Sequence, residues 1–306
     1  MRKMSIEALD LGGPTMGTCW SVRVERPVPD RAGVQAALQA AVAEVDAQMS
    51  TWRPDSDLMR LNAAPVGDWI ALPARLMQVL AAGLEISRQT GGAFEMNVGD
   101  AVRAWGFGAA AIDLAAIRAA SATPRVSAVE ALELEPDQGR ARKTAPLALD
   151  LSGIAKGYGV DRLAETALDC GIGSALCSID GEVRALGGRV WSVGIDTPDA
   201  VTRGQHSVLE LAGTAVATSG DYRHFVTVRG VRLSHTMDPV RGAPVVGAPA
   251  SVTVLGQSCM MADAMATALM VMGAGRGKVF ADKAGISALF LQDQAAVGTG
   301  VFAAAA

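Results

Sequence analysis

The sequence has no long hydrophobic run, no basic cluster and no glycine-rich nucleotide fingerprint, and each absence excludes a class of protein. The longest apolar stretch, Met260 to Gly273, is interrupted by Asp263 and falls short of the roughly 20 apolar residues that span a bilayer. The net charge is −4 without a run of Lys or Arg, which argues against nucleic acid as a partner. No G-x-G-x-x-G string stands between a strand and a helix, so a Rossmann site is not expected.

The sequence also lacks cysteine motifs and a secretion signal. Its four cysteines show no C-x-x-C spacing, so we expect reduced, buried thiols rather than disulfides or zinc ligands. The first ten residues, MRKMSIEALD, carry acids where a secretion signal has an apolar core. These features predict a cytoplasmic protein with no membrane span, and a chain trimmed of its leader would look the same.

Apolar residues are abundant: half of the 306 residues are hydrophobic. A chain of this length buries roughly three quarters of its unfolded surface, so a large core is expected. Periodicity predicts helices at 32–49, 74–89, about 155–170, 259–272 and 278–284. Strand-like runs fall at 18–25, 175–179, 183–186, 190–195, 207–211, 225–228, 252–255 and 286–291. With no repeat and no long linker, we predict one α+β domain over residues 1–306, with antiparallel strands grouped in the second half and helices packed on them.

The segment DLSGIAKGYGVD, Asp150 to Asp161, carries the first candidate chemistry. It turns through Ser152 and Gly153 and places Lys156 in the first turn of a predicted helix. A helix N-terminus has unpaired N–H groups and a partial positive charge, and a lysine there favours an anion such as phosphate. The alternative is a glycine turn before a helix with a solvated lysine.

A second candidate lies in the apolar segment from Cys259 to Gly273. Asp263 and Thr267 are four residues apart and therefore share one face of the predicted helix. A buried carboxylate needs a partner, and a carboxylate, a hydroxyl and a carbonyl oxygen together suit Mg²⁺. Alternatively, Asp263 caps a neighbouring turn and Thr267 bonds back to its own helix.

A third candidate is formed by TSGDYRHF, Thr218 to Phe225, and LSHTMDPVRG, Leu233 to Gly242. The second string places His235, one of only three histidines, beside an Asp-Pro pair. Histidine suits proton transfer near neutral pH. A hydrogen-bonded structural histidine is the alternative.

In this order along the chain, these strings resemble the ApbE family, the FAD:protein FMN transferases. The ordered set is specific, although one such string alone would be weak support. The matching strings are MGTCWSV from Met16, STWRPDSDLMRLN from Ser50, WGFG from Trp105, DLSGIAKGYGVD, TSGDYRHF, LSHTMDP and MMADAMATAL.

The resemblance implies an ApbE-type α+β fold of T-fold-like lobes, with mainly antiparallel sheets, packed helices and a central cleft. It implies FAD in that cleft with Mg²⁺ on the pyrophosphate. The implied reaction transfers FMN to a Thr or Ser hydroxyl of a partner protein and releases AMP. A metal and a lysine would neutralise the charge of the reacting phosphates, and a histidine could take the hydroxyl proton.

The resemblance also implies roles for residues. Asp263 and Thr267 would bind the metal through their side chains, and Gly153 and Ala266 through their carbonyls. His235 would act as the base, and Lys156 would be catalytic beside the pyrophosphate. Contacts with FAD are implied for Met16, Trp52, Phe94, Glu95, Asp150, Lys156, Glu182, Ser219 and Met237.

Two strings depart from the family pattern. The family's F-D-P-T-V-G reads FEMNVG at Phe94 to Gly99, and its Gly-Gly-Asp reads Asp180-Gly181-Glu182. Both departures bear on the nucleotide pocket or the groove for the acceptor peptide. Two alternatives therefore stay open: a Mg²⁺-dependent FAD pyrophosphatase giving FMN and AMP, and a non-catalytic FAD-binding protein.

Overall fold

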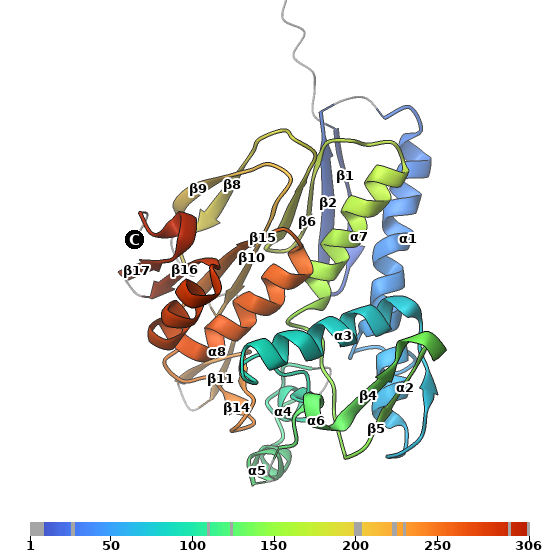
Figure 1. Cartoon of the computed structure of the whole chain (residues 1–306), viewed down its shortest axis with the longest axis vertical. Helices are drawn as coiled ribbons and strands as arrows, with labels where there is room; N and C mark the ends of the chain where they lie inside the picture. The colour runs from blue at the N-terminus through green and yellow to red at the C-terminus, as the bar shows by residue number, and fades with distance from the viewer. Residues whose placement is uncertain are drawn as a thin grey trace, which may run out of the picture.

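The computed structural model describes residues 9–25, 28–108, 111–122, 125–198, 204–221, 225–228, 231–292 and 295–304. Its main element is an eight-stranded sheet in the order β1-β2-β6-β7-β10-β15-β16-β17, with every neighbouring pair antiparallel (Figure 1). The strands are β1 Leu9–Thr15, β2 Thr18–Val24, β6 Ala175–Ile179, β7 Glu182–Leu186, β10 Ala215–Gly220, β15 Ser251–Gly256, β16 Ser287–Gln292 and β17 Ala295–Gly298. The α+β class is confirmed, and the strand predicted at 18–25 is β2, which pairs with β1 at the start of the described chain.

Two tight hairpin turns of this sheet line one cavity of the structure. Met16 and Gly17 join β1 to β2 with φ values of 46° and 73°, the positive pair that a type I′ turn requires. Asp180 and Gly181 join β6 to β7, between the paired residues Ile179 and Glu182. Alternating buried positions along β6 place the odd-numbered side chains in the core, which fixes its register.

Two helices that carry predicted site residues pack on the sheet. α7 Ala155–Asp169 lies on β6 and β7, and α8 Cys259–Ala284 lies on β10 and β15 (Figure 1). α1 Arg31–Met49 packs beside α7, and its N-cap Asp30 accepts a hydrogen bond from the N–H of Gly33. The two helices predicted at 259–272 and 278–284 correspond to two segments of α8, which are separated by non-helical backbone at Gly273, where φ is 75° and ψ is 166°.

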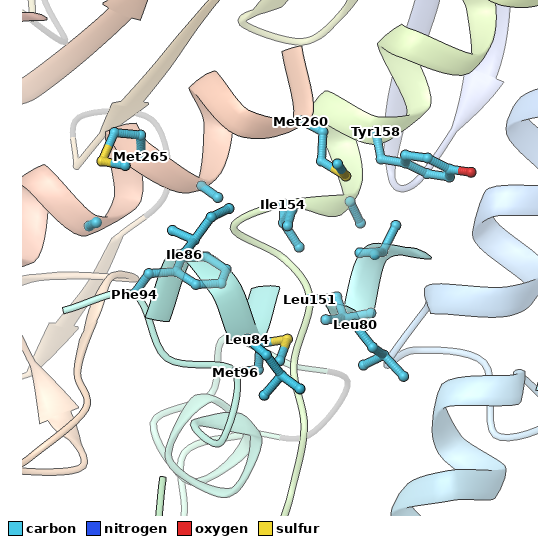
Figure 2. Packing of buried hydrophobic residues seen from close by; sticks show 14 of the residues in the cluster. Leu80, Leu84, Ile86, Phe94, Met96, Leu151, Ile154, Tyr158, Met260 and Met265 are labelled. Carbon is cyan, nitrogen blue, oxygen red and sulfur yellow. The ribbon is translucent and has the colours of Figure 1, made fainter. Parts of the chain in front are cut away.

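A hydrophobic core joins α3 Ala74–Gln89 to α7, α8 and the segment that precedes α7 (Figure 2). A Cβ added at Gly83 of α3 would lie 2.4 Å from the Met96 sulfur, so the glycine makes room for this side chain. The core thereby holds the chain on either side of Phe94 and Asp150 in place. Its labelled members are Leu80, Leu84, Ile86, Phe94, Met96, Leu151, Ile154, Tyr158, Met260 and Met265.

Short elements complete the described residues. The helices are α2 Asp57–Ala63, α4 Gly99–Ala104, α5 Leu114–Ala122, α6 Ala128–Ala131, and the 3₁₀ turns η1 Pro136–Gln138 and η2 Gly300–Phe302. In a three-stranded sheet, β5 Arg140–Lys143 lies between β3 Ile70–Ala71 and β4 Leu132–Glu135. Three two-stranded sheets pair β8 Trp191–Asp196 with β9 Gln205–Leu211, β11 Phe225–Val228 with β12 Val231–Ser234, and β13 Met237–Asp238 with β14 Ala243–Pro244.

The cysteines and the hydropathy of the helices bear on two predictions made from composition. All four cysteines are free, but only Cys177 and Cys259 are buried; Cys19 and Cys170 are exposed, so the expected burial is wrong for those two. None of the helices among the described residues is long and apolar enough to cross a membrane.

Candidate functional site

A cavity of about 890 Å³ lies among the main sheet, the start of α7, α8 and β8. This volume is within the range of small-molecule and cofactor sites. The cavity brings together residues that the sequence separates by up to about 250 positions. Predicted site residues on its wall are Met16, Trp52, Phe94, Glu95, Asp150, Gly153, Lys156, Glu182, Ser219, His235, Met237, Asp263 and Thr267. Ala266 does not line it and is buried within α8.

The start of α7 meets α8 at Asp263. This carboxylate is 4% exposed and accepts a hydrogen bond of 2.9 Å from the N–H of Gly157. Burial raises the pKa of Asp263 to about 6, while the Lys156 ammonium and the Gly157 N–H act in the opposite direction. A Cβ at Gly157 would lie 2.4 Å from the carbonyl oxygen of Cys259, so only glycine permits this approach. The Asp263 carboxylate therefore already occupies part of the anion-binding site that the sequence predicts at the N-terminus of α7.

Oxygen-bearing groups converge one helical turn further along α8. A Cβ built on Gly153 would lie 2.9 Å from Thr267 Oγ1, so these two residues are in direct contact. The hydroxyl of Ser219 lies 3.2 Å from the same Thr267 oxygen. Together with Asp263, these groups offer the carboxylate and hydroxyl oxygens that Mg²⁺ prefers. Within the described ranges no group of three or more His, Cys, Asp or Glu side chains forms a metal site, so a metal here would depend on hydroxyl and carbonyl oxygens and on water.

Lys156 is surrounded by acids. Its ammonium lies 3.0 Å from Glu182 Oε2 and 3.3 Å from Asp180 Oδ2. Glu182 is buried, and this burial raises the pKa of its carboxyl against the opposing effect of Lys156. Burial alone would lower the pKa of Lys156, but the charges of Glu182, Asp263 and Asp180 outweigh it, so that pKa is raised. The lysine stays charged and is already held by protein groups.

Asp161, on the next turn of α7, has a role that the sequence did not indicate. Its buried carboxylate accepts hydrogen bonds from Arg184 Nη1 at 2.6 Å, Ser258 Oγ at 2.7 Å, and the backbone N–H groups of Cys259 and Met260 at 3.0 Å. Asp161 therefore caps the N-terminus of α8. The available signal was a serine before an apolar helix, which marks an N-cap but not its partner.

His235 lies half-buried on the cavity wall, just after β12. Its ring packs edge-to-face on Phe107, with the centroids 6.3 Å apart. The indole N–H of Trp105 donates to the carbonyl of Gly242, which ties the WGFG segment to the turn between β13 and β14. In the TSGDYRHF segment, Tyr222 to His224 lie outside the described residues.

The apolar part of the wall comes from three separate segments. Met16 projects from the β1–β2 turn, and the Trp52 side chain is 62% exposed at the cavity. Phe94 is buried. The aromatic and sulfur-containing side chains that the resemblance singles out therefore lie around one cavity.

The FEMNVG departure has a mainly structural role. Glu95 Oε1 accepts from the N–H groups of Asn97 and Ala128, at 2.8 and 3.0 Å. The buried Asn97 amide donates to the Val126 carbonyl and accepts from the Ala148 N–H, both at 2.8 Å. Asn97 therefore joins three loops behind the wall. In the other departure, Asp180-Gly181-Glu182, all three residues line the cavity.

Comparison with known proteins gives concordant matches. A family model described as the ApbE family matches residues 16–290. A Vibrio cholerae serotype O1 protein named FAD:protein FMN transferase is 36% identical over 293 residues, covering 93% of this chain and 87% of that protein. A Klebsiella pneumoniae protein of the same name is 33% identical, covering 86% and 78%.

Solved structures agree with this result. The flavin transferase ApbE from Vibrio cholerae has a TM-score of 0.83 at 32% identity, covering 97% of this chain and 98% of that one. The Pseudomonas stutzeri flavinyl transferase ApbE, in its apo form, has a TM-score of 0.85 at 33% identity, covering 99% and 98%. A Thermotoga maritima ApbE protein, at 24% identity and a TM-score of 0.86, supports the fold alone.

Proposed function

Because this chain belongs to the ApbE family, we propose that it is a Mg²⁺-dependent FAD:protein FMN transferase. It would move the FMN part of FAD onto a Thr or Ser hydroxyl of a partner protein and release AMP. The observation that carries the proposal is the contact between Gly153 and Thr267, one turn from Asp263, inside the cavity that also holds Lys156.

The cavity suits a long, two-part ligand. Met16, Trp52 and Phe94 offer an apolar surface for a flat ring system, while Lys156 offers a positive charge for phosphate. An apolar pocket with a few convergent polar groups is typical of cofactor sites. This division of the wall supports FAD as the molecule bound.

The oxygen-bearing groups support a metal beside the phosphates. Asp263 and Thr267 would hold Mg²⁺ through their side chains, and Gly153 through its carbonyl. The Ala266 carbonyl has less support, because this residue is not on the cavity wall. When bound, the ion would neutralise the diphosphate and stabilise the leaving phosphate.

The chain's own residues would handle the proton and the remaining charge. The acceptor hydroxyl oxygen bonds to the phosphorus on the FMN side, the bridging P–O bond breaks, and AMP leaves. His235 takes the hydroxyl proton, and the ammonium of Lys156 balances charge on the departing phosphate. The partly buried setting strengthens these interactions relative to water.

The test uses the purified chain with FAD, Mg²⁺ and recombinant candidate acceptors from the same genome. The expected result is an FMN adduct on a Thr or Ser, found by mass spectrometry, with one AMP released per adduct and none with EDTA. Equal release of AMP and free FMN without any adduct would instead indicate a pyrophosphatase. Tight FAD binding without AMP release would indicate a carrier or sensor.

A further inference from the structure

Asp180 has an unusual backbone conformation. Together with Met16, it is one of two non-glycine residues in the described part of the chain with positive φ, here 55°. Glycine is favoured in this region, and side-chain-bearing residues adopt it at a cost. Such outliers concentrate at functional sites. The two-residue turn between β6 and β7 requires this conformation, and it holds the Asp180 side chain on the cavity wall.

The Asp180 carboxylate contacts the lysine of the candidate phosphate site. Its Oδ2 atom lies 3.3 Å from Lys156 Nζ, and the side chain is 23% exposed. Glu182 contacts the same ammonium, but its side chain is only 2% exposed. Both acids on Lys156 therefore line the cavity, but Glu182 is almost fully buried and Asp180 is the more exposed of the two.

These contacts affect how an anion can approach. An ammonium group has three donors, and two carboxylates already accept from the one on Lys156. Asp263 adds a third negative charge nearby. A diphosphate that reaches Lys156 is repelled by these acids, and it finds only one of the three donors open, so to accept from a second donor it must replace a carboxylate. Asp180 is the acid that can leave, because it is the exposed one.

We propose that Asp180 sets the affinity of this site for the diphosphate by competing with it for the ammonium of Lys156. In the empty site its carboxylate holds the lysine; on binding, phosphate oxygens take its place. Asp180 is thus an affinity-determining residue. This inference rests on the proposed function, since it takes FAD as the ligand.

The test is equilibrium binding followed by flavin fluorescence, in EDTA and again in Mg²⁺. The Asp180→Asn variant keeps the size of the side chain and tolerates positive φ, but it removes the charge. We expect its dissociation constant for FAD to be roughly three- to tenfold lower than that of the wild type. Riboflavin, which has the ring and no phosphate, should bind both proteins equally.

The matched control is Asp196→Asn. Asp196 is an exposed acid of β8 on the same cavity wall, so its removal changes the overall charge by the same amount. If the role of Asp180 is specific, the dissociation constant of this control for FAD should differ from that of the wild type by less than twofold.

Each outcome decides the matter. If the wild type binds FAD and Asp180→Asn binds it no more tightly, the inference is wrong and the proposed function stands. The inference is also contradicted if Asp180→Asn lowers the dissociation constant for riboflavin as much as that for FAD, because the effect then does not involve the phosphates. It is likewise contradicted if Asp196→Asn lowers the dissociation constant for FAD as much as Asp180→Asn does, because the effect then does not involve Lys156. If neither protein binds FAD in either buffer, the proposed function fails together with the inference.

Discussion

Asp161 and Asp263 lie on neighbouring helices, and each carboxylate accepts hydrogen bonds from the backbone at the start of the other's helix. Asp263 of α8 accepts from Gly157 in the first turn of α7. Asp161 of α7 accepts from Cys259 and Met260 in the first turn of α8. Carboxylates are stabilised at helix N-termini, so this reciprocal capping fixes the distance between the two helices at the point where both carry site residues.

Asp161→Ala should lower the free energy of unfolding by about 2–4 kcal/mol, because it leaves the buried donors at the start of α8 and the Arg184 guanidinium without their acceptor. Denaturant unfolding measures the loss. The control is Asp30→Ala, which removes the exposed N-cap of α1 and should cost about 1 kcal/mol. Equal losses in the two variants would show that the Asp161 contacts add nothing beyond an ordinary cap.

Gly157→Ala tests how closely the helices approach. The added Cβ would lie 2.4 Å from the Cys259 carbonyl oxygen and 2.7 Å from the Asp263 Cβ, so α7 and α8 must separate. We expect a loss of about 1–3 kcal/mol in unfolding free energy, despite the better helix propensity of alanine. Gly275→Ala, on the open side of α8 with nothing within 4 Å, should instead gain about 0.5–1 kcal/mol. A gain in both variants would contradict the proposed contact.

Asp180→Gly should stabilise the protein by about 0.5–1 kcal/mol, because glycine adopts a φ of 55° without strain. Thermal or denaturant unfolding measures this gain. Asp180→Asn is the control that removes the charge but keeps a side chain at the strained position. If asparagine stabilises as much as glycine, charge repulsion among the acids is the cause rather than the backbone.

The raised pKa of the Glu182 carboxyl predicts that the stability of the protein depends on pH. Burial raises its folded pKa above the ordinary 4.5, and the charged groups facing it are Lys156 on α7, Asp263 on α8 and Asp180 in the adjoining turn. Between pH 4.5 and about 8, the value to which the folded pKa is raised, the folded protein binds more protons at this site than the unfolded chain, so the contribution of Glu182 to stability falls as pH rises. The unfolding free energy of the wild type, relative to that of Glu182→Gln, should decline over this range. A constant difference would contradict the raised pKa.

Much of the site could be predicted from the sequence, because its motifs coincide with helix starts. Lys156 falls on the second residue of α7, and Asp263 and Thr267 share a face of α8, as helical spacing requires. The capping role of Asp161 could not be predicted, since its partners lie about a hundred positions away. The φ of Asp180 also depends on a hairpin register that residue types do not reveal.

Local sequence patterns also led to wrong predictions of one helix boundary and of the burial of two cysteines. Residues 273–278 contain three glycines, and the predicted break between two helices is confirmed by the non-helical backbone of Gly273, but the second helical segment begins before the predicted residue 278. Packing explains this: a Cβ at Gly277 would lie 2.9 Å from the Phe290 ring of β16, so this turn is held against the sheet. Cys19 and Cys170 were expected to be buried, but tertiary placement left both exposed.

Asp263→Asn tests the metal dependence of the reaction. Asparagine keeps the size of the side chain and an oxygen that can accept from the Gly157 N–H, so the contact between α7 and α8 should persist and the fold should remain intact. It removes the negative charge that a hard cation requires. We expect Mg²⁺-dependent AMP release from FAD to fall by at least roughly tenfold, and the Mg²⁺ concentration for half-maximal activity to rise. Chromatography of AMP across a Mg²⁺ titration measures both.

The matched control for this variant is Asp46→Asn, which changes another cavity-lining acid, on α1, whose side chain pairs with Arg53. It should keep the wild-type Mg²⁺ dependence, because it is not among the oxygens that converge on Thr267. Calorimetry of Mg²⁺ binding separates a lost metal site from a slowed reaction. If Asp263→Asn binds and requires Mg²⁺ as the wild type does, the carboxylate is only the cap of α7, and the metal must be held elsewhere in the cavity.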